Sequence, residues 1–276
     1  MKNTKYKMLV TDMDYTLLNK EKNVSERNKK ALKAAMDKGV HVIVATGRIY
    51  TSALYYAKLL GISTPIIASN GAIIREEHTN KTFYQAILSD IAIKEMTRLT
   101  REKGLFCHLF SRDTIYTERI INISVNYTEW NKYLAEEDQV KIKLLNSFED
   151  ISEFERNEIF KAVVVDNDKS KLQYLREEIL KTGIVSVSQS LKDNIEVMSK
   201  EVSKGNAVAK LAELYNIPRE EIITIGDNEN DISMIEYAGL GVAVGNAEQC
   251  LKERADYITD DYMEDGVAKV IEKFIL

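Results

Sequence analysis

The sequence is poor in the residues that staple small secreted proteins or hold zinc. Its 276 residues include only two cysteines, Cys107 and Cys250, which lie far apart and form no CxxC pair. Neither a disulfide framework nor a cysteine-based zinc site can therefore be recognised. The three histidines share no i, i+4 spacing, which excludes an HExxH metalloprotease. The two prolines, Pro65 and Pro218, form no proline-rich linker.

Long apolar runs and an excess of one charge are missing as well. No run approaches the roughly 18 apolar residues that a membrane-spanning helix needs. The run 8–10 meets Asp12 almost at once, so it is too short for the core of a signal peptide. The formal net charge of −5 opposes sequence-independent binding to nucleic acid, because such binding needs a basic surface. We therefore expect a folded cytoplasmic protein that binds neither nucleic acid nor membrane.

The two ends of the chain alternate strands with helices. Short β-branched runs such as Val40–Ala45 are typical of buried parallel strands. Helices are expected after the N-cap residues Ser25 and Ser203. The strands expected in these two parts are 7–11, 40–45, 65–68, 222–225 and 241–244. Strand–helix–strand order of this kind predicts right-handed crossovers and a parallel sheet, and hence an α/β fold.

The middle of the chain follows another pattern, which begins after Ser69-Asn70-Gly71. Hairpin-like pairs of short strands are mixed with helices there, as in an α+β unit with an antiparallel sheet. We therefore expect one parallel-sheet domain, formed by residues 1–83 and 195–276, that is interrupted by an inserted α+β domain of residues 84–194.

Polar loops follow the strands of the expected parallel sheet, and open α/β sheets bind ligands at that edge. The first loop carries Asp12 and Asp14 directly after a buried strand. Two neighbouring carboxylates repel each other, and a divalent cation such as Mg²⁺, which prefers hard oxygen ligands, would compensate them. The alternative is an ordinary acidic turn.

Two further loops carry groups that suit an anion. Thr46-Gly47-Arg48 offers a hydroxyl and free backbone N–H groups at the start of a helix, although the same residues could be a plain N-cap. Lys204, in Ser203-Lys204-Gly205, could reach a phosphate as a point charge, although most lysines are simply solvated. The fourth loop, 226–231, adds carboxylates in Asp227 and Asp231, but it lacks the ligand ladder of an EF-hand.

Taken in order along the chain, these loops resemble the four signature motifs of the haloacid dehalogenase-like superfamily of phosphohydrolases. The matching stretches are DMDYTLL at 12–18, ATGR at 45–48, the lysine of VSKGNA at 202–207 and IGDNENDISM at 225–234. IIASNGA at 66–72 and GVAVGNA at 241–247 are similar to stretches of the Cof-type subfamily. The resemblance implies a Rossmann-like three-layer core. The inserted domain corresponds in size and element order to the large α/β cap of that subfamily.

The resemblance also implies an activity. It is that of a magnesium-dependent phosphatase that hydrolyses a small phosphorylated metabolite, with sugar phosphates as the class most favoured, through an aspartyl-phosphate intermediate. Asp12 would be the nucleophile and Asp14 the general acid and base. Mg²⁺ would be held by Asp12, the main-chain carbonyl of Asp14, Asp227 and Asp231, the last directly or through water.

The transferred phosphoryl group would be held by a separate set of donors. These are implied to be Thr46, the Gly47 N–H, Lys204 and Asn230, of which Thr46 and Lys204 also count as catalytic. For Arg48 we favour a structural ion pair over contact with substrate. The aromatic residues Tyr127, Trp130 and Tyr133 of the inserted domain are expected mainly in its core, with one or two facing the cleft.

Two other functions are compatible with the same residues. One is a phosphosugar mutase or phosphotransferase, in which a sugar hydroxyl replaces water as acceptor. The other is a non-catalytic sensor of a phosphorylated ligand, which the complete set Asp12, Asp14, Lys204 and Asp227 disfavours. The sequence carries no signal for an oligomeric state.

Overall fold

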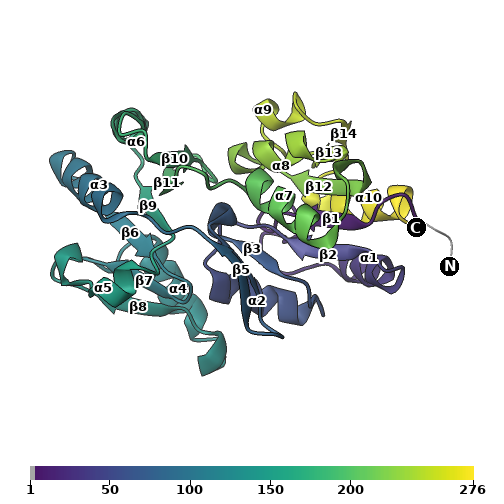
Figure 1. Ribbon diagram of the computed structural model, residues 1–276, viewed down its shortest axis with the longest axis horizontal. Helices are drawn as coiled ribbons and strands as arrows, with labels where there is room; N and C mark the ends of the chain where they lie inside the picture. The colour runs from purple at the N-terminus through teal and green to yellow at the C-terminus, as the bar shows by residue number, and fades with distance from the viewer. Residues whose placement is uncertain (1–3) are drawn as a thin grey trace.

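The computed structural model describes residues 4–276 and has two parts, each built on its own main sheet (Figure 1). One part contains both ends of the chain, and the other is inserted into it. Figure 1 shows α1 (Glu26–Asp37) beside α10 (Gly266–Phe274), although they come from opposite ends of the sequence. Arg27 and Glu272 form an ion pair between these two helices. None of the helices described within residues 4–276 is long and apolar enough to cross a bilayer.

The core sheet has five strands in the order β14-β13-β12-β1-β2, all parallel. Their bounds are Met8–Thr11 (β1), His41–Val44 (β2), Ile222–Gly226 (β12), Leu240–Ala243 (β13) and Tyr257–Ile258 (β14). Strand β1 lies between β12 and β2, so the loops that follow these three strands are neighbours at one edge of the sheet. The α/β fold and the parallel sheet predicted from the sequence are confirmed.

Alternating side chains of β1 belong to two different clusters of buried apolar side chains, one on each face of the sheet. Leu9 packs with the apolar side chains of α1 and α10. Met8 and Val10 pack on the other face with α7 (Lys204–Tyr215) and α8 (Ile232–Tyr237). Because successive strand residues point to opposite faces, a strand that is apolar throughout needs cover on both sides. The core therefore has the three layers expected.

The segment after α2 (Tyr50–Leu59) follows the expected parallel order only in part. Strand β3 (Ile66–Ala68) forms at the predicted place, but it pairs antiparallel with β4 (Ile73–Glu76), which pairs with β5 (Lys81–Gln85). Beside β2, however, β3 keeps the expected direction, because the bridge between Ala45 and Ile67 is parallel. The turn Ser69–Gly71 reverses the chain directly after β3, and this brings β4 back alongside it.

The inserted part has a six-stranded sheet in the order β10-β11-β9-β6-β7-β8. Its strands are Cys107–Phe110 (β6), Thr114–Thr117 (β7), Lys141–Leu144 (β8), Lys161–Val165 (β9), Val185–Ser188 (β10) and Asn194–Ser199 (β11). Its helices are Asp90–Glu102 (α3), Ile123–Asn131 (α4), Glu153–Arg156 (α5) and Lys169–Leu180 (α6). The remaining helix, Gln249–Lys252 (α9), belongs to the core. The expected antiparallel pairing holds except for β7 and β8, which are parallel.

The two faces of the inserted sheet differ in character. Ala162 and Val164 of β9, with Ile195 of β11, pack under α3 and α6, the two helices at the upper left of Figure 1. Lys161 and Glu196 come from the alternate positions and face the core. The strand period of two thus gives this sheet one apolar face under helices and one mixed face toward the core.

The exact division between the parts remains a proposal. Strand β5 continues to Gln85 and pairs with β4, whereas β11 pairs with β9 and β10 of the inserted sheet. We therefore propose that the chain crosses between the parts after Gln85 and again after Ser199, instead of at 83/84 and 194/195.

Candidate active site

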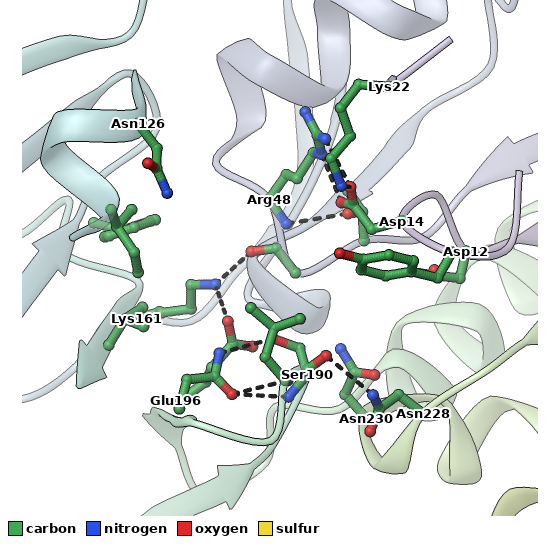
Figure 2. Close-up of a pocket in the computed structure, with 18 of the residues that line it drawn as sticks. Asp12, Asp14, Lys22, Arg48, Asn126, Lys161, Ser190, Glu196, Asn228 and Asn230 are labelled. Atoms are coloured by element: carbon green, nitrogen blue, oxygen red, sulfur yellow. Dashed lines mark hydrogen bonds and ion pairs between the residues drawn. The ribbon is translucent and has the colours of Figure 1, made fainter. Parts of the chain in front are cut away.

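The four loops that the sequence singled out meet at the carboxyl edge of the core sheet. Asp12 follows β1, Thr46 follows β2, Asp227 follows β12, and Lys204 is the first residue of α7. A cleft of about 480 Å³ lies here between the core and the inserted sheet. Figure 2 shows side chains from both parts pointing into it.

Lys204 joins two of these loops. Its side chain is fully buried, and its Nζ lies 2.6 Å from Asp12 Oδ1 and 2.6 Å from Asp231 Oδ1. Burial opposes the positive charge, but the two carboxylates outweigh it and hold the pKa of the ammonium above its ordinary value. Lys204 is therefore a fixed cation at the centre of the site.

Three buried carboxylates surround this single ammonium. Asp12, Asp227 and Asp231 each offer an oxygen atom within 4.8 Å of the others. Burial raises the pKa of Asp12 to about 7, against the opposing effect of Lys204. Burial, together with Asp12 and Asp231, raises the pKa of Asp227 well above its ordinary value. This surplus of negative charge, carried by hard oxygen donors, fits a divalent cation such as Mg²⁺.

The three carboxylates are not equivalent. Asp231 Oδ2 accepts hydrogen bonds from the N–H of Asp227 at 2.9 Å and of Asn228 at 3.1 Å, while its Oδ1 bonds to Lys204. Asp231 Oδ2 thus shapes its own loop, while Oδ1 holds the ammonium of Lys204. A Cβ on Gly226 would lie 2.5 Å from Asp231 Cγ, so this close approach requires glycine.

Asp14 lies outside this cluster and is paired with cations. Arg48 holds it in a two-point ion pair, Nε to Oδ2 at 2.7 Å and Nη2 to Oδ1 at 2.7 Å. Lys22 Nζ approaches Asp14 Oδ1 at 2.8 Å (Figure 2). Burial favours the neutral acid, but Arg48 and Lys22 outweigh it and hold the pKa of Asp14 below its ordinary value. The structural ion pair expected for Arg48 is present, and its partner is Asp14.

The loop after β2 is held in place by its own neighbours. Thr46 Oγ1 accepts a hydrogen bond from the Arg48 N–H at 3.1 Å, and the Thr46 carbonyl accepts one from the Asn70 N–H at 3.0 Å. Within residues 4–276 the Gly47 N–H has no acceptor. Gly47 lines the cleft, so this N–H is available to an anion.

Three residues at the site, Asn70, Lys161 and Glu196, were not assigned to it from the sequence. Asn230 donates from Nδ2 to Asn70 Oδ1 at 3.1 Å, and Asn70 in turn donates to Glu196. Glu196 forms an ion pair with Lys161 at 2.9 Å. Lys161 and Glu196 stand within apolar strand sequences, and a charged residue at a strand position that should be buried is a signal that could have found them.

The aromatic residues of the inserted part have different environments. Tyr127 and Trp130 of α4 line the cleft, and Trp130 lies parallel to Tyr56 with ring centroids 6.2 Å apart. Tyr56 also lies 4.8 Å from the Arg48 guanidinium. The expectation that Tyr133 is mainly a core residue is wrong, because Tyr133 follows the end of α4 and its side chain is 85% exposed.

Comparison with known proteins gives consistent matches. The family described as haloacid dehalogenase-like hydrolase matches residues 9–271. A 5-amino-6-(5-phospho-D-ribitylamino)uracil phosphatase of Bacillus subtilis is 33% identical, over 98% of this chain and 96% of that protein. A pyridoxal phosphate phosphatase of Escherichia coli is 24% identical, over 98% of this chain and 99% of its own length. The solved structure of a haloacid dehalogenase-like hydrolase from B. subtilis superposes with a TM-score of 0.86 at 29% identity, over 98% of this chain and all of the other.

Proposed function

The chain belongs to the haloacid dehalogenase-like hydrolases and is a phosphatase, and from this premise we propose that it hydrolyses a small sugar phosphate or a similar phosphorylated metabolite through an aspartyl-phosphate. The observation that carries the proposal is the contact of Lys204 with Asp12 and Asp231, beside Asp227. Membership of a phosphatase family disfavours the purely sensory role considered above. The curated relatives at 33% and 24% identity are named phosphatases of small phosphate esters, which favours water as the acceptor.

Magnesium is the cofactor that we propose. Asp12, Asp227 and the main-chain carbonyl of Asp14 would hold it, while Asp231 supports the loop and contributes directly or through water. When bound, Mg²⁺ would neutralise the negative charge shared by the carboxylates and the phosphoryl group. The surplus of buried carboxylates over ammonium groups supports this assignment.

Asp12 is the nucleophile in this proposal. Its carboxylate oxygen would form a bond to phosphorus as the bond from phosphorus to the leaving oxygen breaks. A carboxylate and a phosphate repel each other by about 4 kcal/mol per unit pair at 4 Å and an effective dielectric near 20. Lys204, 2.6 Å from Asp12 Oδ1, offsets part of that repulsion. The Gly47 N–H, Thr46 and Asn230 would donate to the phosphoryl oxygens.

Asp14 would move the protons. It would give a proton to the leaving oxygen in the first half of the reaction and take one from the attacking water in the second. The ion pairs with Arg48 and Lys22 keep Asp14 in the ionised form that the second half needs. Release of these pairs when the substrate enters would let Asp14 carry the proton for the first half.

The test is the Asp12→Asn variant, which keeps the size of the side chain but removes the nucleophile. We expect release of inorganic phosphate to be lost across a panel of sugar phosphates and other small esters in the presence of Mg²⁺. The circular dichroism spectrum should stay unchanged. Rates near those of the unmodified protein would contradict the nucleophile assignment, and isomerised sugar phosphate in place of inorganic phosphate would favour a mutase.

A further inference from the structure

The inserted sheet carries a buried ion pair that reaches into the core. Lys161 on β9 and Glu196 on β11 are only 2% and 4% exposed, and Lys161 Nζ lies 2.9 Å from Glu196 Oε1 (Figure 2). Both residues occupy the alternate strand positions that point away from α3 and α6. A buried ion pair adds little to stability by itself, and this one makes further contacts on the core side.

Lys161 contacts a loop that we assign to phosphoryl binding, and Glu196 contacts the neighbouring turn at Asn70. Lys161 Nζ donates a hydrogen bond to the Gly47 carbonyl, and Glu196 Oε2 accepts one from Asn70 Nδ2. The packing between these groups is close. A Cβ on Gly47 would lie 3.0 Å from Asn70 Oδ1 and 3.2 Å from Glu196 Oε2.

Asn70 connects this pair with the other loops of the site. Its N–H donates to the Thr46 carbonyl at 3.0 Å, and its Oδ1 accepts from Asn230 Nδ2 at 3.1 Å. A Cβ on the adjacent Gly71 would lie 2.4 Å from the Ser203 carbonyl, directly before Lys204. Asn70 therefore contacts or adjoins the loops that carry Thr46, Asn230 and Lys204.

The backbone around Asn70 is held in an unusual conformation. Ser69, Asn70 and Gly71 all have positive φ, at 49°, 58° and 98°. Among residues 4–276 the buried Ser69 Oγ has no hydrogen-bond partner. Left-handed backbone at successive non-glycine residues persists only where surrounding contacts fix it. Glu196 supplies the charged contact to the side chain of Asn70, and charged acceptors form the stronger hydrogen bonds.

We propose that Glu196, held by Lys161, is a positioning residue for phosphoryl transfer. Through Asn70 it orients the Asn230 amide, while Lys161 fixes the loop that presents the Gly47 N–H. Both contacts come from the inserted part, so the donors are fully aligned only when the inserted sheet is docked on the core. Docking of the inserted part is thereby coupled to the chemical step. This inference rests on the proposed phosphatase mechanism.

The test is the Glu196→Gln variant, assayed with p-nitrophenyl phosphate at saturating Mg²⁺. Removing one donor to a developing oxyanion typically lowers kcat by about 10²–10³-fold, and misaligned donors should cost less. We expect kcat to fall by roughly 10- to 100-fold, with KM changed by less than about threefold. Inhibition by vanadate, which imitates the trigonal-bipyramidal transition state, should weaken by a similar factor to kcat, whereas inhibition by inorganic phosphate should change little.

A matched control separates positioning from general loss of structure. Glu118 is another carboxylate of the inserted part, bonded to Arg101 at 2.9 Å and to the Phe148 N–H at 3.1 Å, outside the cleft. Glu118→Gln should leave kcat and the vanadate constant within about twofold, as expected for a site that makes no contact with the reacting groups. A loss of structure in Glu196→Gln would lower the thermal midpoint and the active fraction, but would not change the ratio of the vanadate and phosphate constants.

A second variant keeps the test decisive if Glu196→Gln does not fold. Asn70→Gly preserves the left-handed backbone and the Lys161–Glu196 pair but removes the link to Asn230, so kcat should fall by a similar factor. In the double variant the two losses should not multiply, because both act through the same route. Unchanged kcat in either single variant, or losses that multiply, would overturn the inference. An unmodified protein without phosphatase activity would instead contradict the proposed function.

Discussion

Removal of the metal should make the stability of the protein fall as the pH rises through the neutral range. The perturbation is chelation with EDTA, which leaves Asp12 buried beside Asp227 and Asp231. Burial raises the pKa of Asp12 from 3.8 to about 7, so the folded protein keeps a proton that the unfolded chain has already lost. Stability therefore decreases with pH between those two values, because ionising Asp12 is harder in the folded state.

The size of this effect follows from the same two values. A difference of about three pKa units, at ~1.4 kcal/mol each, gives up to about 4 kcal/mol of stability lost between pH 4 and pH 7. Asp12→Asn has no carboxyl at this position, so it should lack this part of the pH dependence. Saturating Mg²⁺ binds the ionised form and should restore more stability at pH 7.5 than at pH 5.5.

The assay is urea unfolding followed by circular dichroism at several pH values, with and without EDTA, for the unmodified protein and Asp12→Asn. The difference in unfolding free energy between the two proteins should change across this range in EDTA. An equal pH slope for both proteins in EDTA would refute the reasoning, and so would an equal effect of Mg²⁺ at both pH values.

Two further predictions concern the loops and the inserted part. Gly226→Ala places a methyl group against Asp231, so we expect the free energy of unfolding to fall by about 1–3 kcal/mol and the phosphatase rate to fall with it. An unchanged urea midpoint would contradict the assigned packing. Burial lowers the pKa of His108, so the folded protein resists protonation that the unfolded chain accepts below about pH 6.5. Stability should therefore be lost as the pH falls below that value, and His108→Gln should show a shallower loss in the same urea assay; equal slopes would count against a buried neutral imidazole.

The meeting of the four loops could be predicted from the sequence for a physical reason. Asp12, Thr46 and Asp227 each come directly after an apolar strand, and parallel strands bring their carboxyl ends to one edge. Lys204 follows a clear N-cap, Ser203, which fixes where α7 begins. Local patterns and one rule of sheet topology were sufficient here. The resemblance to the haloacid dehalogenase-like family is confirmed by the match over residues 9–271.

Contacts that depend on the docking of the two parts could not be predicted in the same way. The partners in the Lys161–Glu196–Asn70 connection are brought together by tertiary packing, and no sequence spacing encodes it. The antiparallel pairing of β3 was missed because the left-handed turn at 69–71 contains Ser69, which rarely adopts positive φ. The parallel pairing of β7 and β8 likewise depends on the path of the segment that carries α4 between them.

The central claim is that the phosphoryl group passes through Asp12. The most direct measurement uses the Asp14→Asn variant with p-nitrophenyl phosphate, whose leaving group needs no proton, followed by an acid quench and mass spectrometry of the peptides. Attack by Asp12 should proceed while hydrolysis of the intermediate is slowed, so a phosphoryl group should accumulate on Asp12. Release of p-nitrophenol with the phosphoryl group on another residue, or on none, would contradict the account.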